Sequence, residues 1–411
     1  MKLGILVLLL IPFGVRLNAI TLTVGTDAQY KSIKSALQAC NDNDTVVVGE
    51  GIYKEGNLII SKKIVFIGQP GAILDGESQY EILSIKSSNV VVKGFKLQNS
   101  GFSTLNDPGA IKVYDAHNVV VENNILENNF FGIYIQYGQN CVIKNNQIHS
   151  TGTEEQKIGN GIHCWKSDSL LIIGNEVSGH RDGIYFEFVS NSLVWRNKSK
   201  HNVRYGLHFM FSNSDSYIAN QFIANGAGVA VMFSKGVRMY NNYFKENWGE
   251  AAYGILLKEI SDSEILANTF DQNTAALYLE GASRMIIEKN SFVKNGWALK
   301  MQASCIDNKV SLNNFFSNTF DVSTNGTVVL NSFDQNYWDK YEGYDLNKDG
   351  VGDIPFHPLS LFCVLSERNP TMMFIFRSFI VDLLDKSEKL LPSITPMNFV
   401  DEKPMMKSYS L

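Results

Sequence analysis

A short alternation of apolar and polar positions recurs through most of this 411-residue chain. Eight segments that start with Gly or Ala carry the pattern, and they begin at positions 132, 161, 183, 206, 228, 254, 276 and 298. Asn residues keep step with these segments, at positions 124, 146, 175, 197, 220, 242, 268, 290 and 314. A repeat of about 22 residues is too short to bury its own apolar face. The copies must therefore stack into a continuous solenoid.

Each repeat alternates with a period of two residues and has Gly and Asn at its corners, which predicts strands and turns rather than helices. We therefore expect an all-β fold, a single-stranded right-handed parallel β-helix over residues 20–357. An amphipathic stretch from Tyr30 to Cys40 predicts a short helix that caps the open end of the first coil. From Pro358 the apolar spacing becomes helical, which predicts a helical C-terminal tail over residues 358–411.

The N-terminus and the composition narrow the class of protein. Residues 1–19 contain one Lys, an apolar run and a small-residue cleavage site, which is typical of a secretory signal peptide. The apolar run is short of the ~20 residues needed to span a bilayer. A net charge of −5 does not suggest a nucleic-acid partner. Five scattered cysteines without a CxxC motif disfavour a disulfide framework.

The repeats also place soft metal ligands on one face. When the strands are aligned on the first Gly or Ala, two columns form the core, and the residues between them point outward because side chains alternate along a strand. Met210 and Met232 are then outward neighbours on adjacent coils, with His208 beside Met210. His163 lies two coils from His208 in the same column. Thioether and imidazole together suit Cu(I), so these four residues are the candidate copper ligands.

The same residues admit a structural interpretation. If the polar insertion between Asn146 and Gly161 folds over this face, the two methionines and the histidine are a second small core. The sequence leaves both interpretations open.

A second candidate metal site follows the last repeat. Positions 1, 3, 5 and 9 of a calcium-binding loop are occupied by Asp345, Asn347, Asp349 and Asp353, and position 6 is Gly350. Position 12 is not Glu, so an EF-hand is not supported. The segment is therefore either a turn stiffened by calcium or a plain turn without metal.

The order of motifs along the chain resembles one known family. The segments GNGIHCW, RDGIYFEF, YGLHFMFS, AVMFS and AAYGILLKEI, followed by NYWDKYEGYDLNKDGVGDIPFHP, are similar to those of the NosD family, periplasmic β-helix proteins that mature nitrous-oxide reductase. The resemblance implies a periplasmic accessory protein of denitrification that helps to assemble the copper-sulfur centre of that reductase. In this role it would bind or deliver copper or sulfur.

The resemblance also implies partners. These are an ABC transporter made of a permease and an ATPase, a membrane-attached copper chaperone and the apo form of nitrous-oxide reductase. By the same resemblance the tail docks on the permease, which would keep the protein at the membrane. Its candidate docking residues are Met372, Met373, Phe376, Phe379 and Leu383.

A carbohydrate-binding or polysaccharide-cleaving β-helix protein is the main alternative. The outward columns carry aromatic side chains that can stack on sugar rings, namely Trp165, Tyr134, Tyr185 and Tyr278. Cleavage of a glycan needs two carboxylates close together. Glu187 and Glu280 on the outward column are four coils apart, so we identify no catalytic residues and predict that the protein is not an enzyme.

Overall fold

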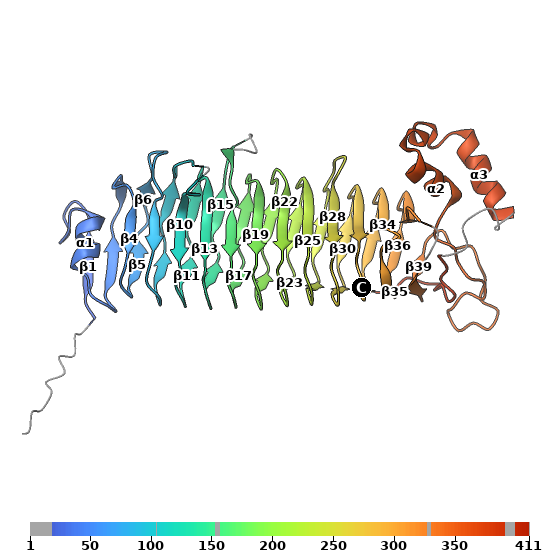
Figure 1. Ribbon diagram of the computed structural model, residues 1–411, viewed down its shortest axis with the longest axis horizontal. Coiled ribbons are helices and arrows are strands. Elements are labelled where there is room, and N and C mark those ends of the chain that lie inside the picture. Colours follow the sequence, from blue (N-terminus) through green and yellow to red (C-terminus); the bar gives the residue numbers. More distant parts are fainter. Residues whose placement is uncertain (1–18, 104, 153–156, 327–329, 391–398, 411) are drawn as a thin grey trace, which may run out of the picture.

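The computed structural model describes residues 19–103, 105–152, 157–326, 330–390 and 399–410. They form an elongated solenoid, and successive coils add strands to three parallel sheets that run along its length (Figure 1). The prediction of a right-handed parallel β-helix is confirmed. The predicted signal peptide lies outside the described residues, except for its last position.

The strands of each sheet follow one another from coil to coil. Sheet A contains β1 (Thr21–Val24), β2 (Thr45–Val48), β5 (Val65–Gly68), β8 (Val91–Lys93), β11 (Val120–Glu122), β14 (Val142–Lys144), β17 (Leu171–Ile173), β20 (Leu193–Trp195), β23 (Ser216–Ile218), β26 (Arg238–Tyr240), β29 (Glu264–Leu266), β32 (Ile286–Glu288), β35 (Ile306–Ser311) and β38 (Leu330–Asp334). Sheet B contains β3 (Gly51–Tyr53), β6 (Ala72–Asp75), β9 (Lys96–Gln98), β12 (Ile125–Glu127), β15 (Gln147–His149), β18 (Glu176–Ser178), β21 (Lys198–Lys200), β24 (Gln221–Ile223), β27 (Tyr243–Lys245), β30 (Thr269–Asp271), β33 (Ser291–Val293), β36 (Asn314–Phe316) and β39 (Tyr337–Trp338). Sheet C contains β4 (Leu58–Ile60), β7 (Leu83–Ile85), β10 (Gly109–Tyr114), β13 (Phe131–Gln136), β16 (Ile162–Trp165), β19 (Asp182–Glu187), β22 (Tyr205–Met210), β25 (Ala227–Met232), β28 (Tyr253–Lys258), β31 (Ala275–Glu280), β34 (Trp297–Met301) and β37 (Phe320–Ser323).

Sheet C has the register that the repeats predict. Ile162 pairs with Ile184, Ile184 with Leu207 and Leu207 with Val229, and all four side chains are buried in the coil. The solenoid core also contains a stack of rings, with centroids 4.0–5.3 Å apart, formed by Phe222, Phe244, Phe270, Phe292, Phe315 and Trp338. The predicted capping helix is present as α1 (Ile33–Ala39), which buries Ile33, Ala36 and Leu37.

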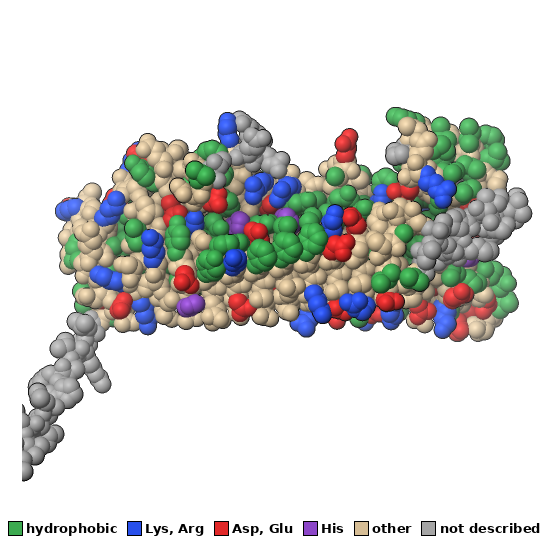
Figure 2. All heavy atoms as spheres, viewed as in Figure 1, with side chains coloured by type: hydrophobic (Ala, Val, Ile, Leu, Met, Phe, Trp, Pro, Cys, Tyr) green, Lys and Arg blue, Asp and Glu red, His purple; other side chains and the backbone are tan. Residues whose placement is uncertain are grey.

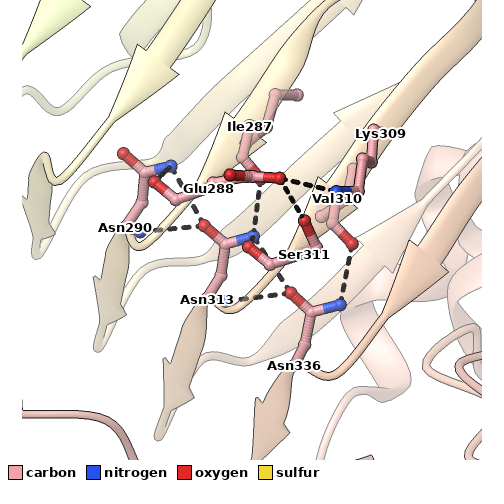
Figure 3. A network of polar contacts seen from close by, with 8 residues as sticks. All are labelled: Ile287, Glu288, Asn290, Lys309, Val310, Ser311, Asn313 and Asn336. Carbon is pink, nitrogen blue, oxygen red and sulfur yellow. Dashed lines mark hydrogen bonds and ion pairs between the residues drawn. The ribbon is translucent and has the colours of Figure 1, made fainter. Parts of the chain in front are cut away.

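Asparagine ladders fix the corners between the coils. Figure 3 shows three consecutive members, in which the Asn313 Oδ1 accepts hydrogen bonds from the Asn290 backbone N–H at 2.9 Å and from its Nδ2 at 3.0 Å. Asn336 accepts the same pair of bonds from Asn313. The sequence comparison assigned Asn314 to this ladder, but Asn313 occupies the position because Asn314 lies in β36. The comparison missed a second ladder, which contains Asn202, Asn225, Asn247, Asn273, Asn295 and Asn318.

The helices of the tail lie between Leu361 and Leu390 in the described residues. The tail contains α2 (Leu361–Arg368), the 3-10 helix η2 (Pro370–Ile375) and α3 (Phe379–Leu390), beside the last coils in Figure 1. Phe362 packs on Phe320 of β37. Glu367 of α2 forms an ion pair with Lys300 at 2.7 Å and accepts a hydrogen bond from Ser323 at 2.8 Å. These contacts attach the helices to the end of the solenoid.

The C-terminal segment 399–410 returns to the solenoid and closes its last corner. Asp401 is fully buried, and its Oδ2 accepts hydrogen bonds from the backbone N–H and Nδ2 of Asn336 and from Trp338 Nε1. Its Oδ1 accepts from the backbone N–H groups of Gln335 and Lys403. Asp401 therefore ends the first asparagine ladder.

Asp215 carries a buried carboxylic acid that is only partly hydrogen-bonded. The Asp215 side chain has no solvent exposure, and its Oδ1 accepts the Ser192 N–H at 2.8 Å, but its Oδ2 has no hydrogen-bond partner. Burial raises the pKa of Asp215 to about 8. Four coils later, Asn308 occupies the equivalent position, with its Oδ1 on the backbone N–H of Met285.

We expect Asp215→Asn to stabilise the protein at neutral pH. In the unfolded chain an Asp ionises near pH 3.9, whereas the folded protein keeps this proton up to about pH 8. The stability that the protonated acid contributes is therefore present below about pH 4 and is lost as the pH rises to about 8. Denaturant unfolding measures the free energy of unfolding of both proteins at pH 4.5 and pH 8. The difference in favour of the variant should increase by roughly 2–5 kcal/mol from the lower to the higher pH. An identical pH dependence in both proteins would contradict this expectation.

Candidate functional site

The outer face of sheet C carries the predicted soft ligands. Met210 at the end of β22 pairs with Met232 at the end of β25, so the two thioethers project from adjacent coils. Both side chains are half-buried. His208 is two residues before Met210 on the same face, but only 6% of it is exposed. The structure therefore brings His208, Met210 and Met232 together, with the imidazole below the surface and the sulfurs nearer to solvent.

His163 belongs to a separate part of the same column. The rings of Tyr134, His163, Tyr185 and His208 stack from coil to coil, with centroid separations of 4.4, 4.8 and 4.7 Å. Because the Tyr185 ring lies between the two histidines, they cannot ligate one ion with these side-chain positions. The geometry favours a site of His208, Met210 and Met232, to which His163 is a neighbour.

The nitrogen atoms of the two histidines differ in their partners. His208 has no hydrogen-bond partner at Nδ1 or Nε2, and both atoms are shielded from water. His163 Nδ1 lies 3.0 Å from Asn160 Nδ2, whereas its Nε2 has no partner. Burial, assisted by the Arg181 cation, lowers the pKa of His163 to about 3, so this ring is neutral at physiological pH. An unpartnered buried imidazole is unusual, and a small ion can satisfy it.

An ion pair between the buried Asp182 and the partly exposed Arg204 lies beside His208. The carboxylate of Asp182 has no solvent exposure and accepts two hydrogen bonds from Arg204, at 3.0 and 2.7 Å. Its Oδ2 is 3.8 Å from His208 Nδ1. Burial opposes the charged carboxylate, but the His208 imidazole and the Arg204 guanidinium outweigh it and hold the pKa of Asp182 below its usual value. A neighbouring carboxylate orients a ligating imidazole and raises its basicity.

Tyr185 connects the imidazole column to the thioethers. Its hydroxyl donates a hydrogen bond to Met210 Sδ at 3.6 Å. Burial, with help from the Glu187 carboxylate, raises the pKa of Tyr185 to about 12, so the hydroxyl keeps its proton. The contact orients the Met210 side chain and leaves a second sulfur lone pair for another partner.

Of the four candidate copper ligands, the insertion between Asn146 and Gly161 contacts only His163 in the described residues. Asn160, at the end of the insertion, contacts His163. The centroids of the Phe131 and His163 rings are 5.4 Å apart. Residues 153–156 of the insertion lie outside the described residues. His163 is therefore part of a small core on the outer face, while the two methionines keep partial exposure.

The predicted calcium loop is an exposed turn that bonds to its own backbone. Asp345 accepts hydrogen bonds from the N–H groups of Lys348, Asp349 and Gly350. In the same way, Asp353 accepts one from the N–H of Leu346. Asn347 and Asp349 accept from the N–H groups two residues ahead of them. The sequence prediction of calcium here stays a prediction.

The tail residues predicted to dock on a partner fall into two groups. Met372, Met373 and Phe376 pack against the small apolar cluster around Phe320 and Phe362. In contrast, 78% of Phe379 and 53% of Leu383 are exposed on α3. Phe379 and Leu383 are therefore the most exposed residues of the predicted docking set.

The aromatic residues considered as sugar platforms contact other side chains of the protein. Tyr134 is buried, and Tyr185 lies between two imidazoles. The Lys166 ammonium lies 4.6 Å from the centre of the Trp165 ring. Tyr278 contacts Tyr253 with ring centroids 5.1 Å apart. These contacts disfavour stacking on a glycan.

Two features of the site were missed from the sequence. One is the ion pair between Asp182 and Arg204, whose only sequence signal is that the two residues are one repeat of 22 residues apart. The other is an exposed stack of Phe188, Phe211 and Phe233, each of which directly follows an outward residue of sheet C. An alignment of the repeats that included the residue after each strand of sheet C would have shown these three phenylalanines in one column.

Two absences apply to the described part of the chain. No group of three or more His, Cys, Asp or Glu side chains there can hold a metal ion. In the same residues, no helix is long and apolar enough to cross a membrane. The five cysteines, all within the described residues, are buried and free.

The fold and its soft-ligand face define a parallel β-helix protein with a candidate copper site. Residues 145–347 match the family described as "Periplasmic copper-binding protein (NosD)", and residues 46–163 match the right-handed β-helix region. The chain is similar to the NosD family over residues 145–347, as its motifs predict.

Two relatives carry the NosD description, and a solved structure shares the fold. The chain is 27% identical to a probable ABC transporter binding protein NosD of Stutzerimonas stutzeri, over 86% of this chain and 85% of the relative. A protein of the same description from Pseudomonas aeruginosa is 26% identical, over 86% of both chains. The structure of the surface adhesin PfbA of Streptococcus pneumoniae matches with a TM-score of 0.57 and 12% identity, covering 72% of this chain and 87% of the adhesin. This last likeness shows the fold alone.

Proposed function

We propose that the protein is a periplasmic accessory protein that binds Cu(I) at His208, Met210 and Met232 for the assembly of the copper-sulfur centre of nitrous-oxide reductase. In this proposal copper is the cargo, and the protein is not an enzyme. His163 is a neighbour that positions Tyr185. Export by the predicted signal peptide brings the protein to the periplasm.

The observation that carries the proposal is the set of donors on sheet C. Two thioethers lie on adjacent coils, the Tyr185 phenol contacts the first of them, Met210, and a buried imidazole without a hydrogen-bond partner lies beside Met210. Thioether and imidazole select Cu(I) over hard cations, which prefer carboxylate and carbonyl oxygens. The relatives described as ABC transporter binding proteins support a role beside a transporter.

Metal analysis of the purified mature protein tests the proposal. We expect about one Cu(I) per chain when the protein is loaded under reductant and desalted, and far less after loading with Cu(II) without reductant. Calcium is measured in the same samples, because the loop at Asp345, Asn347, Asp349 and Asp353 is predicted to hold it. A protein that retains no Cu(I) under reductant would rule out the copper role.

We further propose that α3 docks on the permease of an ABC transporter whose ATPase supplies the energy. Phe379 and Leu383 are the exposed apolar residues of the predicted docking set. We expect the pair Phe379→Ser and Leu383→Ser to reduce the amount of transporter that co-purifies with the protein from membranes by about tenfold. Leu105→Ser, at an exposed apolar residue far from the tail, is the control and should change nothing. Equal recovery with all variants would exclude α3 as the docking site.

The carbohydrate alternative has less support. The ring contacts described above disfavour sugar stacking, and the four-coil spacing predicted for Glu187 and Glu280 agrees with the pairing of the strands between them. At ~4.8 Å per coil this separation is well beyond the reach of a catalytic carboxylate pair.

A copper chaperone and the apo-reductase remain the proposed donor and recipient of the cargo.

A further inference from the structure

Three phenylalanine rings form an exposed ladder along one corner of the solenoid. Phe188, Phe211 and Phe233 lie on consecutive coils, and neighbouring ring centroids are 5.1 Å apart. The rings are nearly parallel, with interplanar angles of 8° and 17°. Their exposed fractions are 46%, 38% and 40%. Figure 2 shows hydrophobic side chains gathered below the histidines in the middle of this face.

The fold does not require phenylalanine at these positions. Eight consecutive coils, from Asp115 to Gly281, have a left-handed backbone at this corner, and the φ angles of the three phenylalanines are 54°, 52° and 52°. Other coils carry different residues at the equivalent position, namely Asp115, Tyr137, Lys166, Glu259 and Gly281. Left-handed backbone is unfavourable for a bulky side chain, and exposed apolar surface is unfavourable in water. A contiguous exposed apolar patch on a soluble protein usually marks an interaction site.

The arrangement of the rings indicates the kind of partner. Phe211 lies between the other two rings, and Phe188 and Phe233 each have one face against it, so the ladder presents mainly ring edges to solvent. Sugars and nucleic-acid bases stack on exposed ring faces, of which this ladder offers few. Apolar side chains of a protein can pack against ring edges. Charged residues on both sides, Lys166 and Glu259, provide the polar rim that is common at protein interfaces.

The place of the ladder points to one class of partner. Phe211 directly follows Met210, and Phe233 directly follows Met232, so the rings border the thioethers of the candidate copper site. A Cu(I) ion that passes between proteins without release into water needs the ligands of both proteins within bonding distance of it at once. The partner that exchanges the ion must therefore cover the surface beside Met210 and Met232.

We propose that the phenylalanine ladder of Phe188, Phe211 and Phe233 is the docking surface of a metal-carrying protein whose own soft ligands lie in an apolar face, and which exchanges Cu(I) directly with Met210 and Met232. This inference rests on the proposed function, because it takes Cu(I) as the cargo. The ladder provides the contact area for the partner, and the thioethers of Met210 and Met232 ligate the Cu(I) that is exchanged.

Asparagine substitutions separate docking from folding. Asn tolerates the left-handed backbone, so a triple variant with Phe188→Asn, Phe211→Asn and Phe233→Asn should unfold at the same or a higher denaturant concentration than the parent. Leu312→Asn is the matched control, because Leu312 is also apolar, has a φ of 59° and lies on another corner. A triple variant that fails to fold would show that the ladder is structural and would overturn the proposal.

The partner is identified with a photo-crosslinking benzoylphenylalanine at position 211 in cells. We expect one main adduct, with a protein that binds Cu(I) when purified, and its loss when Phe188 and Phe233 are replaced by Asn. Transfer of Cu(I) from that purified protein to the triple variant should slow by about tenfold or more. Affinity for Cu(I) supplied as a small chelate should stay unchanged, as in the Leu312→Asn control. An adduct that binds no copper, no adduct at position 211, or unchanged transfer would overturn the proposal.

These measurements also separate failure of this inference from failure of the proposed function. If the chain binds no Cu(I) from the chelate, the copper role fails. If the chain binds Cu(I) but the triple variant accepts Cu(I) from the partner as fast as the parent does, only the proposal of the docking surface is wrong.

Discussion

Replacing Met210 and Met232 together with Leu is expected to weaken Cu(I) binding by about two orders of magnitude or more. Loss of residues that only orient metal ligands already lowers affinity 10- to 100-fold, so loss of two sulfur donors should do at least as much. Leu has nearly the volume of Met, and each exchange should change stability by less than about 1.5 kcal/mol. Competition with a Cu(I) chelator under anaerobic conditions measures the change in affinity.

The chain offers a matched control for this experiment. Met239 and Met285 are methionines buried inside the coils, away from the outer face. Replacing both with Leu should leave the affinity unchanged within a factor of about two. His208→Gln should weaken binding, whereas His163→Gln should have a smaller effect because the Tyr185 ring separates it from the sulfurs. Equal affinity of the double Met210 and Met232 variant and the parent would remove these residues from the site.

Replacing Asp401 with Ala is expected to open the C-terminal end of the solenoid. The carboxylate accepts hydrogen bonds from both donors of Asn336 and from Trp338 Nε1 and the Gln335 N–H, so the variant leaves several buried donors without a partner. At roughly 1–3 kcal/mol for each orphaned group, and with partial relaxation, the loss is about 3–5 kcal/mol. Released from its corner, segment 399–410 should become a site of rapid proteolysis.

Asp401→Asn tests the physical reason for this effect. Both carboxylate oxygens face N–H donors, whereas an amide offers one acceptor and places an NH₂ against the remaining donors. We expect about half of the loss seen with Ala. Asp349→Ala, in the exposed turn, is the control and should leave both the unfolding midpoint and the proteolysis pattern of the C-terminus unchanged. A C-terminus that stays protected in Asp401→Ala would show that Phe399 and its neighbours hold the segment without the carboxylate.

The sequence alone predicted how the chain folds and which residues face outward. A side-chain period of two and a coil period near 22 residues leave one register in which the apolar columns are buried, and that register places Met210 beside Met232. The prediction of the asparagine ladder failed at one position, where the repeat period does not distinguish two neighbouring residues. Asn313 and Asn314 are adjacent, so pattern alone could not tell which of them joins the ladder.

Only the tertiary structure decided the features that depend on contacts between distant segments. It buried His208 against the ring of Tyr205, paired Asp182 with Arg204, and joined Asp401 to Asn336, 65 residues earlier in the chain. It also stacked the rings of Phe188, Phe211 and Phe233. The sequence determined the repeat because a repeat is a local pattern. Burial, ion pairs and ring stacking are set by which side chains meet across coils, and that depends on the packed three-dimensional arrangement.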